Sequence, residues 1–165
     1  MAGSPETIAH IALGGNVGDV EATLRQAVAR MDQSPGIRVL RVSRLDWTEP
    51  VGGPAGQGRY LNGVAEIATT LRPRELLTAL QAIEASLGRD RGREVRWGPR
   101  TCDLDIALMG EQVVDEADLV IPHPRMHQRR FVLAGLAELA PAATHPVRHK
   151  TMAQLLGDLD EAESG

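Results

Sequence analysis

The segment from Cys102 to Ile106 constrains the fold most, because apolar and acidic side chains alternate along it. Side chains of a β-strand point alternately to the two faces of a sheet. Asp103 and Asp105 would therefore share one face, roughly 6.6 Å apart at about 3.3 Å rise per residue. The other face, directed at an apolar core, would carry Cys102, Leu104 and Ile106. The pattern predicts a half-buried strand over 103–109 with a carboxylate pair on its open face.

Paired carboxylates on an open face are typical ligands of hard divalent cations. Mg²⁺ binds one or two carboxylates and shares its other positions with water and substrate phosphates. The same spacing also occurs on edge strands where both acids are simply solvated, so the pair by itself does not identify a site. The flanking sequence favours the metal site, because Arg96-Trp97-Gly98-Pro99-Arg100 lies just before the pair.

The charge of the chain points to the kind of ligand. A formal net charge of -4 does not favour general attraction to nucleic acid or to an anionic membrane. Within residues 89–100, however, five arginines stand against one aspartate and one glutamate. Guanidinium groups bind phosphate through two parallel hydrogen bonds. This segment therefore indicates an anionic ligand with phosphate groups.

Length and composition fit a single domain. The chain has 165 residues, of which 42% are hydrophobic, enough for one apolar core. We expect one domain over residues 1–165, with flexible ends at 1–6 and 160–165. No apolar run reaches the length of a membrane span, and the N-terminus lacks the pattern of a secretory signal. We therefore expect a cytoplasmic monomer without membrane or nucleic-acid partners.

Four aromatic residues stand out by their surroundings. Each lies beside arginine, turn or other polar residues rather than in an apolar run, so the core must be aliphatic. Aromatic side chains in such settings can stack on a flat heterocycle, although each taken singly is more often a packing residue at the rim of a core. The four are Trp47, Tyr60, Trp97 and Phe131.

Hydrophobic periodicity predicts the order strand, helix, strand, strand, helix, strand, followed by extra C-terminal elements. The strands are expected at 7–13, 37–45, 60–69, 103–109 and 112–114, and the helices at 20–31, 73–87, 131–139 and 151–159. This order predicts an α+β fold of the ferredoxin-like, split βαβ type, with an antiparallel sheet flanked by helices. That fold hosts many functions and identifies none of them.

Several short motifs follow one another in a fixed order over roughly residues 8–140. They are Leu13-Gly14-Gly15-Asn16, Thr48-Glu49-Pro50-Val51-Gly52, Tyr60-Leu61-Asn62, Leu87-Gly88-Arg89, the string from Arg96 to Asp105, and Ile121-Pro122-His123-Pro124 with Phe131. Together they resemble the 6-hydroxymethyl-7,8-dihydropterin pyrophosphokinase family of folate synthesis. The string from Arg96 to Asp105 is the most specific part of this resemblance.

The resemblance implies transfer of pyrophosphate from the co-substrate ATP to the hydroxymethyl oxygen of a reduced pterin, with AMP as the leaving group. It implies that Asp103 and Asp105 hold two Mg²⁺ ions. Arg89 and Arg100 would stabilise the charge that develops, since positioning and electrostatics dominate phosphoryl transfer. Asp105 could accept the hydroxyl proton, or the metal could acidify the alcohol without a separate base.

The resemblance also divides further residues between the two substrates. The nucleotide side would be formed by Gln81, Glu84, Arg91, Trp97, Arg100, Ile106, His123 and Arg129. The pterin side would be formed by Thr48, Pro50, Val51, Tyr60, Asn62, Trp97 and Phe131. The rings of Tyr60 and Phe131 would lie above and below the pterin, and the Asn62 amide would bind its edge.

Two other functions stay open on the residues alone. One is another metal-dependent phosphoryl-transfer or hydrolytic enzyme, which would need the aspartate pair but not the aromatic and amide residues together. The other is an RNA-binding ferredoxin-like module that uses the arginines of 89–100. The acidic net charge disfavours the RNA-binding module, because carboxylates repel a phosphate backbone.

Overall fold

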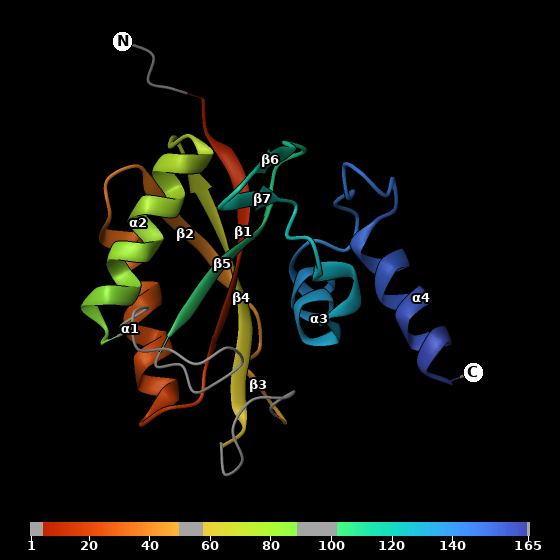
Figure 1. The fold of residues 1–165 in the computed structure, drawn as a ribbon, viewed down its shortest axis with the longest axis horizontal. Helices are drawn as coiled ribbons and strands as arrows, with labels where there is room; N and C mark the ends of the chain where they lie inside the picture. Colours follow the sequence, from red (N-terminus) through yellow and green to blue (C-terminus); the bar gives the residue numbers. More distant parts are fainter. Residues whose placement is uncertain (1–4, 50–57, 89–101, 165) are drawn as a thin grey trace.

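The computed structural model describes residues 5–49, 58–88 and 102–164, and it confirms the predicted α+β, ferredoxin-like fold (Figure 1). The main sheet has the order β2-β4-β1-β5, with every neighbouring pair antiparallel. Its strands are β1 (Thr7–Gly15), β2 (Ile37–Val42), β4 (Tyr60–Thr69) and β5 (Asp103–Met109), and the short β3 (Asp46–Thr48) pairs with β4.

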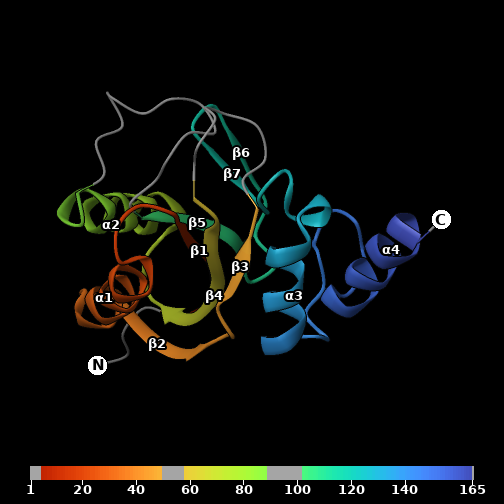
Figure 2. The ribbon, with the colours of Figure 1, turned by 90° about the horizontal axis from the view of Figure 1, so that it is seen from below.

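The helices cover both faces of this sheet, as Figures 1 and 2 show. Helices α1 (Val20–Gln33) and α2 (Pro73–Ser86) pack on one face, and α3 (Arg130–Leu139) packs on the other. Helix α4 (Met152–Ser164) lies on the outer side of α3. A hairpin of β6 (Val114–Glu116) and β7 (Leu119–Ile121) follows β5 and leads to the short 3-10 helix η1 (Met126–Gln128).

Local sequence signals explain where the first two helices begin. The Asp19 carboxylate caps α1 by accepting a hydrogen bond from the backbone N–H of Ala22 at 3.3 Å. Pro73 occupies the first turn of α2, where a missing N–H costs nothing. The Glu75 side chain accepts from the backbone N–H of Arg72 at 2.8 Å and so satisfies the donor just before the first turn of α2.

The sheet separates two apolar clusters. The cluster under α1 and α2 includes Ile11, Leu24, Met31, Leu80 and Leu104. The cluster under α3 and α4 includes Val64, Leu108, Leu133, Leu136 and Met152. Because both faces of the sheet are buried, β4 consists almost entirely of buried residues.

A ladder of polar side chains crosses the sheet on the α3 face. Glu66 pairs with His10 on one neighbouring strand and with Arg41 on the other. His10 Nε2 donates to the carboxylate at 2.9 Å, and Arg41 donates to it at 3.1 Å. Burial lowers the pKa of His10, so its ring is neutral. Burial opposes ionisation of Glu66, but the two hydrogen bonds outweigh it and lower the pKa of Glu66.

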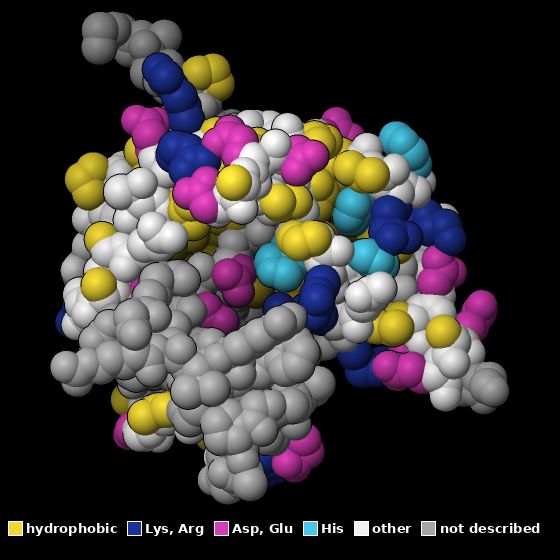
Figure 3. Space-filling view, in the orientation of Figure 1, with side chains coloured by type: hydrophobic (Ala, Val, Ile, Leu, Met, Phe, Trp, Pro, Cys, Tyr) yellow, Lys and Arg dark blue, Asp and Glu magenta, His cyan; other side chains and the backbone are white. Residues whose placement is uncertain are grey.

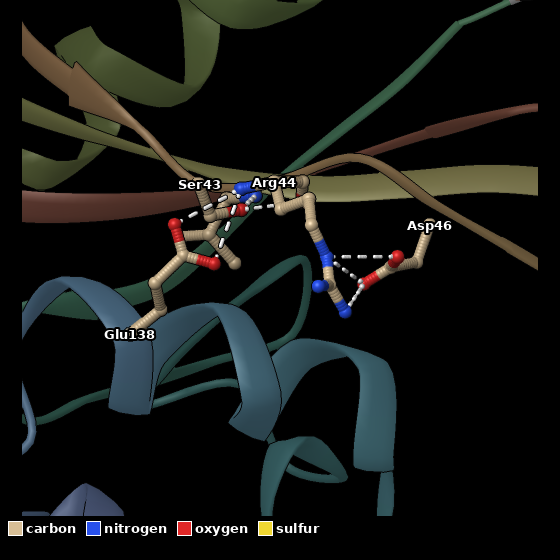
Figure 4. Close-up of polar contacts among 5 residues, drawn as sticks. Ser43, Arg44, Asp46 and Glu138 are labelled. Carbon is tan, nitrogen blue, oxygen red and sulfur yellow. Dashed lines mark hydrogen bonds and ion pairs between the residues drawn. The ribbon is translucent and has the colours of Figure 1, made fainter.

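Hydrogen bonds hold the C-terminal end of α3 against the β2 side of the sheet. Arg41 donates from its guanidinium to the backbone carbonyl of Leu139. The Glu138 carboxylate accepts from the backbone N–H of Arg44 at 3.0 Å, and the Arg44 guanidinium pairs with Asp46 at 3.2 Å (Figure 4). These contacts fix the axis of α3 across the sheet, so its N-terminal end is held beside β1 and β4.

The sequence missed β3, β7 and η1, each of which has only three residues and is too short for periodicity to detect. The strand expected at 112–114 begins two residues later, as β6. Helix α4 runs to Ser164, beyond the predicted end at 159. Arg130 forms ion pairs with Asp160 and Glu163, which gives the last turns of α4 a tertiary contact that the local sequence does not reveal.

Gly135 lies where α3 packs closely on β4. A Cβ atom added there would lie 2.5 Å from Cγ2 of Val64 and 3.0 Å from its Cβ. Backbone-to-strand contact at this distance leaves no room for a methyl group.

We expect Gly135→Ala to lower the free energy of unfolding by about 1–3 kcal/mol, although alanine is the better helix former. Gly157→Ala on α4 is the matched control, since nothing lies within 4 Å of its added Cβ, and it should raise stability by up to about 1 kcal/mol. Urea unfolding of both variants measures the difference. Equal stabilisation by both substitutions would contradict the close packing of α3 on β4.

Candidate functional site

A cavity of about 730 Å³ opens beside the β4, β1 and β5 strands, below the N-terminal end of α3. Figure 3 shows acidic and histidine side chains gathered around a hollow in this face, with basic side chains next to them. Its lining residues are Ala12, Leu13, Gly14, Thr48, Glu49, Tyr60, Asn62, Asp103, Asp105, His123, Arg125, Gln128, Arg129, Arg130 and Phe131.

The carboxylate pair lies at the beginning of β5. Asp103 and Asp105 are half-buried and line the cavity, whereas Leu104 and Ile106 between and after them are buried in the core under α1 and α2. Strand β5 pairs with β1 so that Asp103 faces Gly14 and Asp105 faces Ala12. The two acids thus share the cavity face, as alternation along a strand requires.

A second group of lining residues comes from β3 and β4. Thr48 pairs with Tyr60 across the two strands. The Asn62 side chain is buried and donates through its Nδ2 to Thr48 Oγ1 at 2.6 Å. This hydrogen bond sets the orientation of the Asn62 amide and directs its Oδ1 toward β1.

Gly14 leaves open the space between the Asn62 amide and the carboxylates. A Cβ at this position would lie 3.0 Å from Asn62 Oδ1. Gly14 is paired with Asn62 on one side and with Asp103 on the other. A side chain at residue 14 would therefore fill the space between them.

His123 lies at the outer edge of β5. Its backbone N–H donates to the carbonyl of Ala107 at 3.0 Å, after a cis peptide bond between Ile121 and Pro122. Burial lowers the pKa of His123 to about 4, and the charge of Arg129 acts in the same direction. The ring is therefore neutral near pH 7. Its Nδ1 accepts from the backbone N–H of Arg125 at 3.2 Å, so the ring proton is on Nε2, where it can be donated to a ligand.

The N-terminal end of α3 supplies a ring and two cations. The Arg129 guanidinium lies over the ring of Phe131, 5.0 Å from its centroid. The adjacent Arg130 donates to Glu163 of α4 at 2.7 Å and also pairs with Asp160. The two arginines are thus held in different ways, one by the aromatic ring and the other by α4.

The cavity brings together eight of the residues that the sequence predicted. They are Thr48, Tyr60, Asn62, Asp103, Asp105, His123, Arg129 and Phe131. Three others are described but do not line it: Gln81 is exposed on α2, whereas Glu84 and Ile106 are buried. Pro50, Val51, Arg89, Arg91, Trp97 and Arg100 lie outside the described residues.

Sequence reasoning missed several residues of the cavity wall. Arg125 and Gln128 lie in and beside the short helix η1, between the predicted His123 and Arg129. A single turn of 3-10 helix places residues three apart on one side, which is the signal that could have found them. Gly14 belonged to a motif of the sequence, but only the pairing of β1 with both neighbours reveals its place in the cavity.

No helix in 5–49, 58–88 or 102–164 is long and apolar enough to cross a membrane. In the same ranges no three His, Cys, Asp or Glu side chains are grouped so that they could hold a metal ion.

Comparison with known proteins agrees with this arrangement. Residues 10–141 match the family described as 7,8-dihydro-6-hydroxymethylpterin-pyrophosphokinase (HPPK). The chain belongs to this family. Over 132 residues it is 52% identical to the 2-amino-4-hydroxy-6-hydroxymethyldihydropteridine pyrophosphokinase of Bacillus subtilis, covering 80% of this chain and 77% of that protein. The resemblance inferred from the motifs is confirmed, and the chain is a pyrophosphokinase.

Two further comparisons extend this result. The enzyme of the same name from Pseudomonas aeruginosa is 47% identical over 132 residues, covering 80% of each chain. The fold resembles that of a solved HPPK-DHPS protein of Plasmodium falciparum, with a TM-score of 0.75 and 13% identity. That alignment covers 99% of this chain but only 45% of the solved one. At such low identity it shows the fold alone.

In the metal-free protein we expect the free energy of unfolding to fall as the pH drops below 6.5 toward 4, because unfolded His123 takes up a proton there and the folded side chain does not. His123→Asn removes this proton uptake. It should reduce the slope of stability against pH by up to about 1.4 kcal/mol per pH unit. Urea unfolding across this range measures both slopes, and identical slopes would contradict a neutral His123.

Proposed function

We propose that this cavity is the active site, in which the chain transfers pyrophosphate from ATP to the hydroxymethyl oxygen of 6-hydroxymethyl-7,8-dihydropterin and releases AMP. One observation carries the proposal. The carboxylates of Asp103 and Asp105 line the same cavity as the Asn62 amide and the rings of Tyr60 and Phe131. The metal-bound phosphates of ATP and the flat pterin would therefore be bound next to each other in this cavity.

The reaction requires alignment more than covalent participation by the protein. The pterin hydroxymethyl oxygen forms a bond to the β-phosphorus of ATP, the bond from that phosphorus to the bridging oxygen of AMP breaks, and the hydroxyl proton is released. Holding the two reactants in line and balancing the charge on the phosphates supplies most of the rate enhancement in such transfers. The cavity provides groups for both tasks.

The aspartate pair fits Mg²⁺. This ion commonly uses one or two carboxylates and completes its octahedron with water and substrate phosphates. Asp103 and Asp105 would hold two such ions, which would neutralise phosphate charge and polarise the attacking and departing oxygens. Their shared face and their position on the cavity wall support this role.

The pterin would lie toward β3 and β4. Tyr60 and Phe131 offer aromatic surfaces for stacking, and Asn62 offers both a donor and an acceptor in the plane of a ring. The hydrogen bond from Asn62 to Thr48 would hold the amide in one orientation for this edge. Pro50 and Val51 are proposed to complete the pterin side.

The nucleotide would lie toward β5 and η1. Neutral His123 would donate from Nε2 to an oxygen of the nucleotide, and Arg125 and Arg129 would add positive charge near the phosphates. The remaining proposed nucleotide and charge-stabilising residues are Gln81, Arg89, Arg91, Trp97, Arg100 and Ile106. Glu84, which the resemblance placed on the nucleotide side, is buried and accepts from the backbone N–H of Leu104, so we assign it a role behind the carboxylate pair. The monomeric state, the cytoplasmic location and the lack of nucleic-acid or membrane partners stay predictions.

Given Mg-ATP and 6-hydroxymethyl-7,8-dihydropterin, the protein should form AMP, and not ADP, in step with the pyrophosphorylated pterin. Asp103→Asn keeps the size of the side chain but removes its charge, and it should lower kcat about a hundredfold or more because metal binding is lost. Chromatographic separation of the nucleotides measures both outcomes.

The exposed Asp115 of β6, which does not line the cavity, provides the control for the aspartate substitution. Asp115→Asn should leave turnover unchanged. Production of ADP, or full turnover after removal of Mg²⁺ by a chelator, would contradict the proposed reaction.

We expect Asn62→Ala to raise the KM for the pterin about tenfold or more, because the edge of the heterocycle loses its in-plane partners. The KM for ATP should stay within about twofold, since Asn62 lies on the β4 side of the cavity. Steady-state kinetics with each substrate varied in turn separates the two constants. A parallel rise in both would instead indicate that the sheet itself is disturbed.

A further inference from the structure

A buried carboxylate holds the backbone between the two aspartates. Glu84 is the last buried residue of α2, with 1% of its surface exposed, and its Oε2 accepts from the backbone N–H of Leu104 at 2.8 Å. Leu104 is the residue between Asp103 and Asp105. Glu84 therefore contacts the main chain at the centre of the carboxylate pair.

The position of β5 in the sheet explains why this contact matters. Strand β5 is at the end of the order β2-β4-β1-β5, so among the residues that the structure describes only one of its edges pairs with another strand of that sheet. Backbone N–H groups of successive residues point alternately to the two edges. The N–H of Leu104 bonds to Glu84, so it points to the outer edge, and the carboxylate takes the place of a neighbouring strand.

Glu84 and the aspartates approach Leu104 from opposite faces. Helix α2 packs on the apolar face of the sheet, where the Leu104 side chain is buried, whereas Asp103 and Asp105 line the cavity. Glu84 does not line the cavity. Its carboxylate is thus suited to fix the strand rather than to contact a ligand there.

We propose that Glu84 is a positioning residue, which anchors the backbone of β5 at Leu104 and so sets the two carboxylates of Asp103 and Asp105 for binding a divalent cation. The inference rests on the proposed function of this pair. A free end of an edge strand can twist, and a twist at Leu104 changes the direction of both flanking side chains together. A hydrogen bond from the backbone N–H to a buried side-chain oxygen resists that motion.

Three substitutions separate the hydrogen bond from the charge. Glu84→Ala removes the acceptor. Glu84→Asp keeps the charge but shortens the side chain by one methylene, so the carboxylate no longer reaches Leu104. Glu84→Gln loses the charge but keeps a side chain of the same length, with an oxygen that can still accept from Leu104. Glu75→Ala is the control for loss of α2 stability, because Glu75 caps the same helix without touching β5.

The first measurement is amide hydrogen exchange of the ligand-free protein, read at Leu104. Exchange should be about tenfold faster in Glu84→Ala and Glu84→Asp, and within about threefold of the parent protein in Glu84→Gln. Glu75→Ala should change exchange at the start of α2 but not selectively at Leu104. Unchanged exchange at Leu104 in Glu84→Asp overturns the anchoring role, even if Glu84→Ala does not fold.

The second measurement is the affinity for Mn²⁺, used as a spectroscopic probe, with a nonhydrolysable ATP analogue present. Glu84→Asp and Glu84→Ala should weaken metal binding about tenfold, as changes behind a metal ligand typically do, while Glu84→Gln stays close to the parent protein. Pterin affinity should stay within about twofold in all three. Full Mn²⁺ affinity in Glu84→Asp, or a loss in Glu84→Gln as large as that in Glu84→Asp, would overturn the proposal, because the reach of the side chain would then not determine metal binding. Selective exchange at Leu104 without any Mg²⁺-dependent formation of AMP would instead refute the proposed function and leave the anchor in place.

Discussion

The register of three antiparallel strands is the constraint on which the site depends. Gly14 of β1 is paired with Asn62 of β4 on one side and with Asp103 of β5 on the other. This single row across the sheet sets an amide and a carboxylate on either side of a residue without a side chain. A slip of one residue in either pairing would turn one of the polar groups into the apolar cluster under α1 and α2. The chemistry of the cavity and the packing of the core therefore enforce the same register.

Helix α3 closes the cavity because it is fixed at its far end. The ladder of His10, Glu66 and Arg41 crosses the sheet and reaches the last carbonyl of α3, and Glu138 binds the backbone at Arg44. With that end held, the first turn of the helix carries its arginines and its phenylalanine to the cavity. The buried carboxylates of Glu66 and Glu84 have comparable structural roles on opposite faces of the sheet. Each accepts hydrogen bonds that align elements distant in sequence.

Sequence patterns predicted the long elements well. The strands at 60–69 and 103–109 begin and end where the structure has them, because each combines a clear pattern with turn residues on both sides. Three-residue strands have no period to detect. The last turns of α4 depend on ion pairs with Arg130, a residue on another helix. Such contacts connect positions that local sequence reasoning treats separately.

For the candidate site, too, some features were predictable from the sequence and others were not. The sequence by itself determined the chemical groups: alternation along one strand put Asp103 and Asp105 on a common face, and the polar settings of the aromatic residues indicated a flat ligand. Only the tertiary structure decided which of these groups meet. It set Asn62 and Asp103 on either side of Gly14 through strand register, added Arg125 from a short helical turn, and turned Glu84 toward a backbone N–H at the edge of the sheet. The physical reason is that a residue's type fixes what it can bind, whereas long-range strand pairing and burial fix what it lies next to.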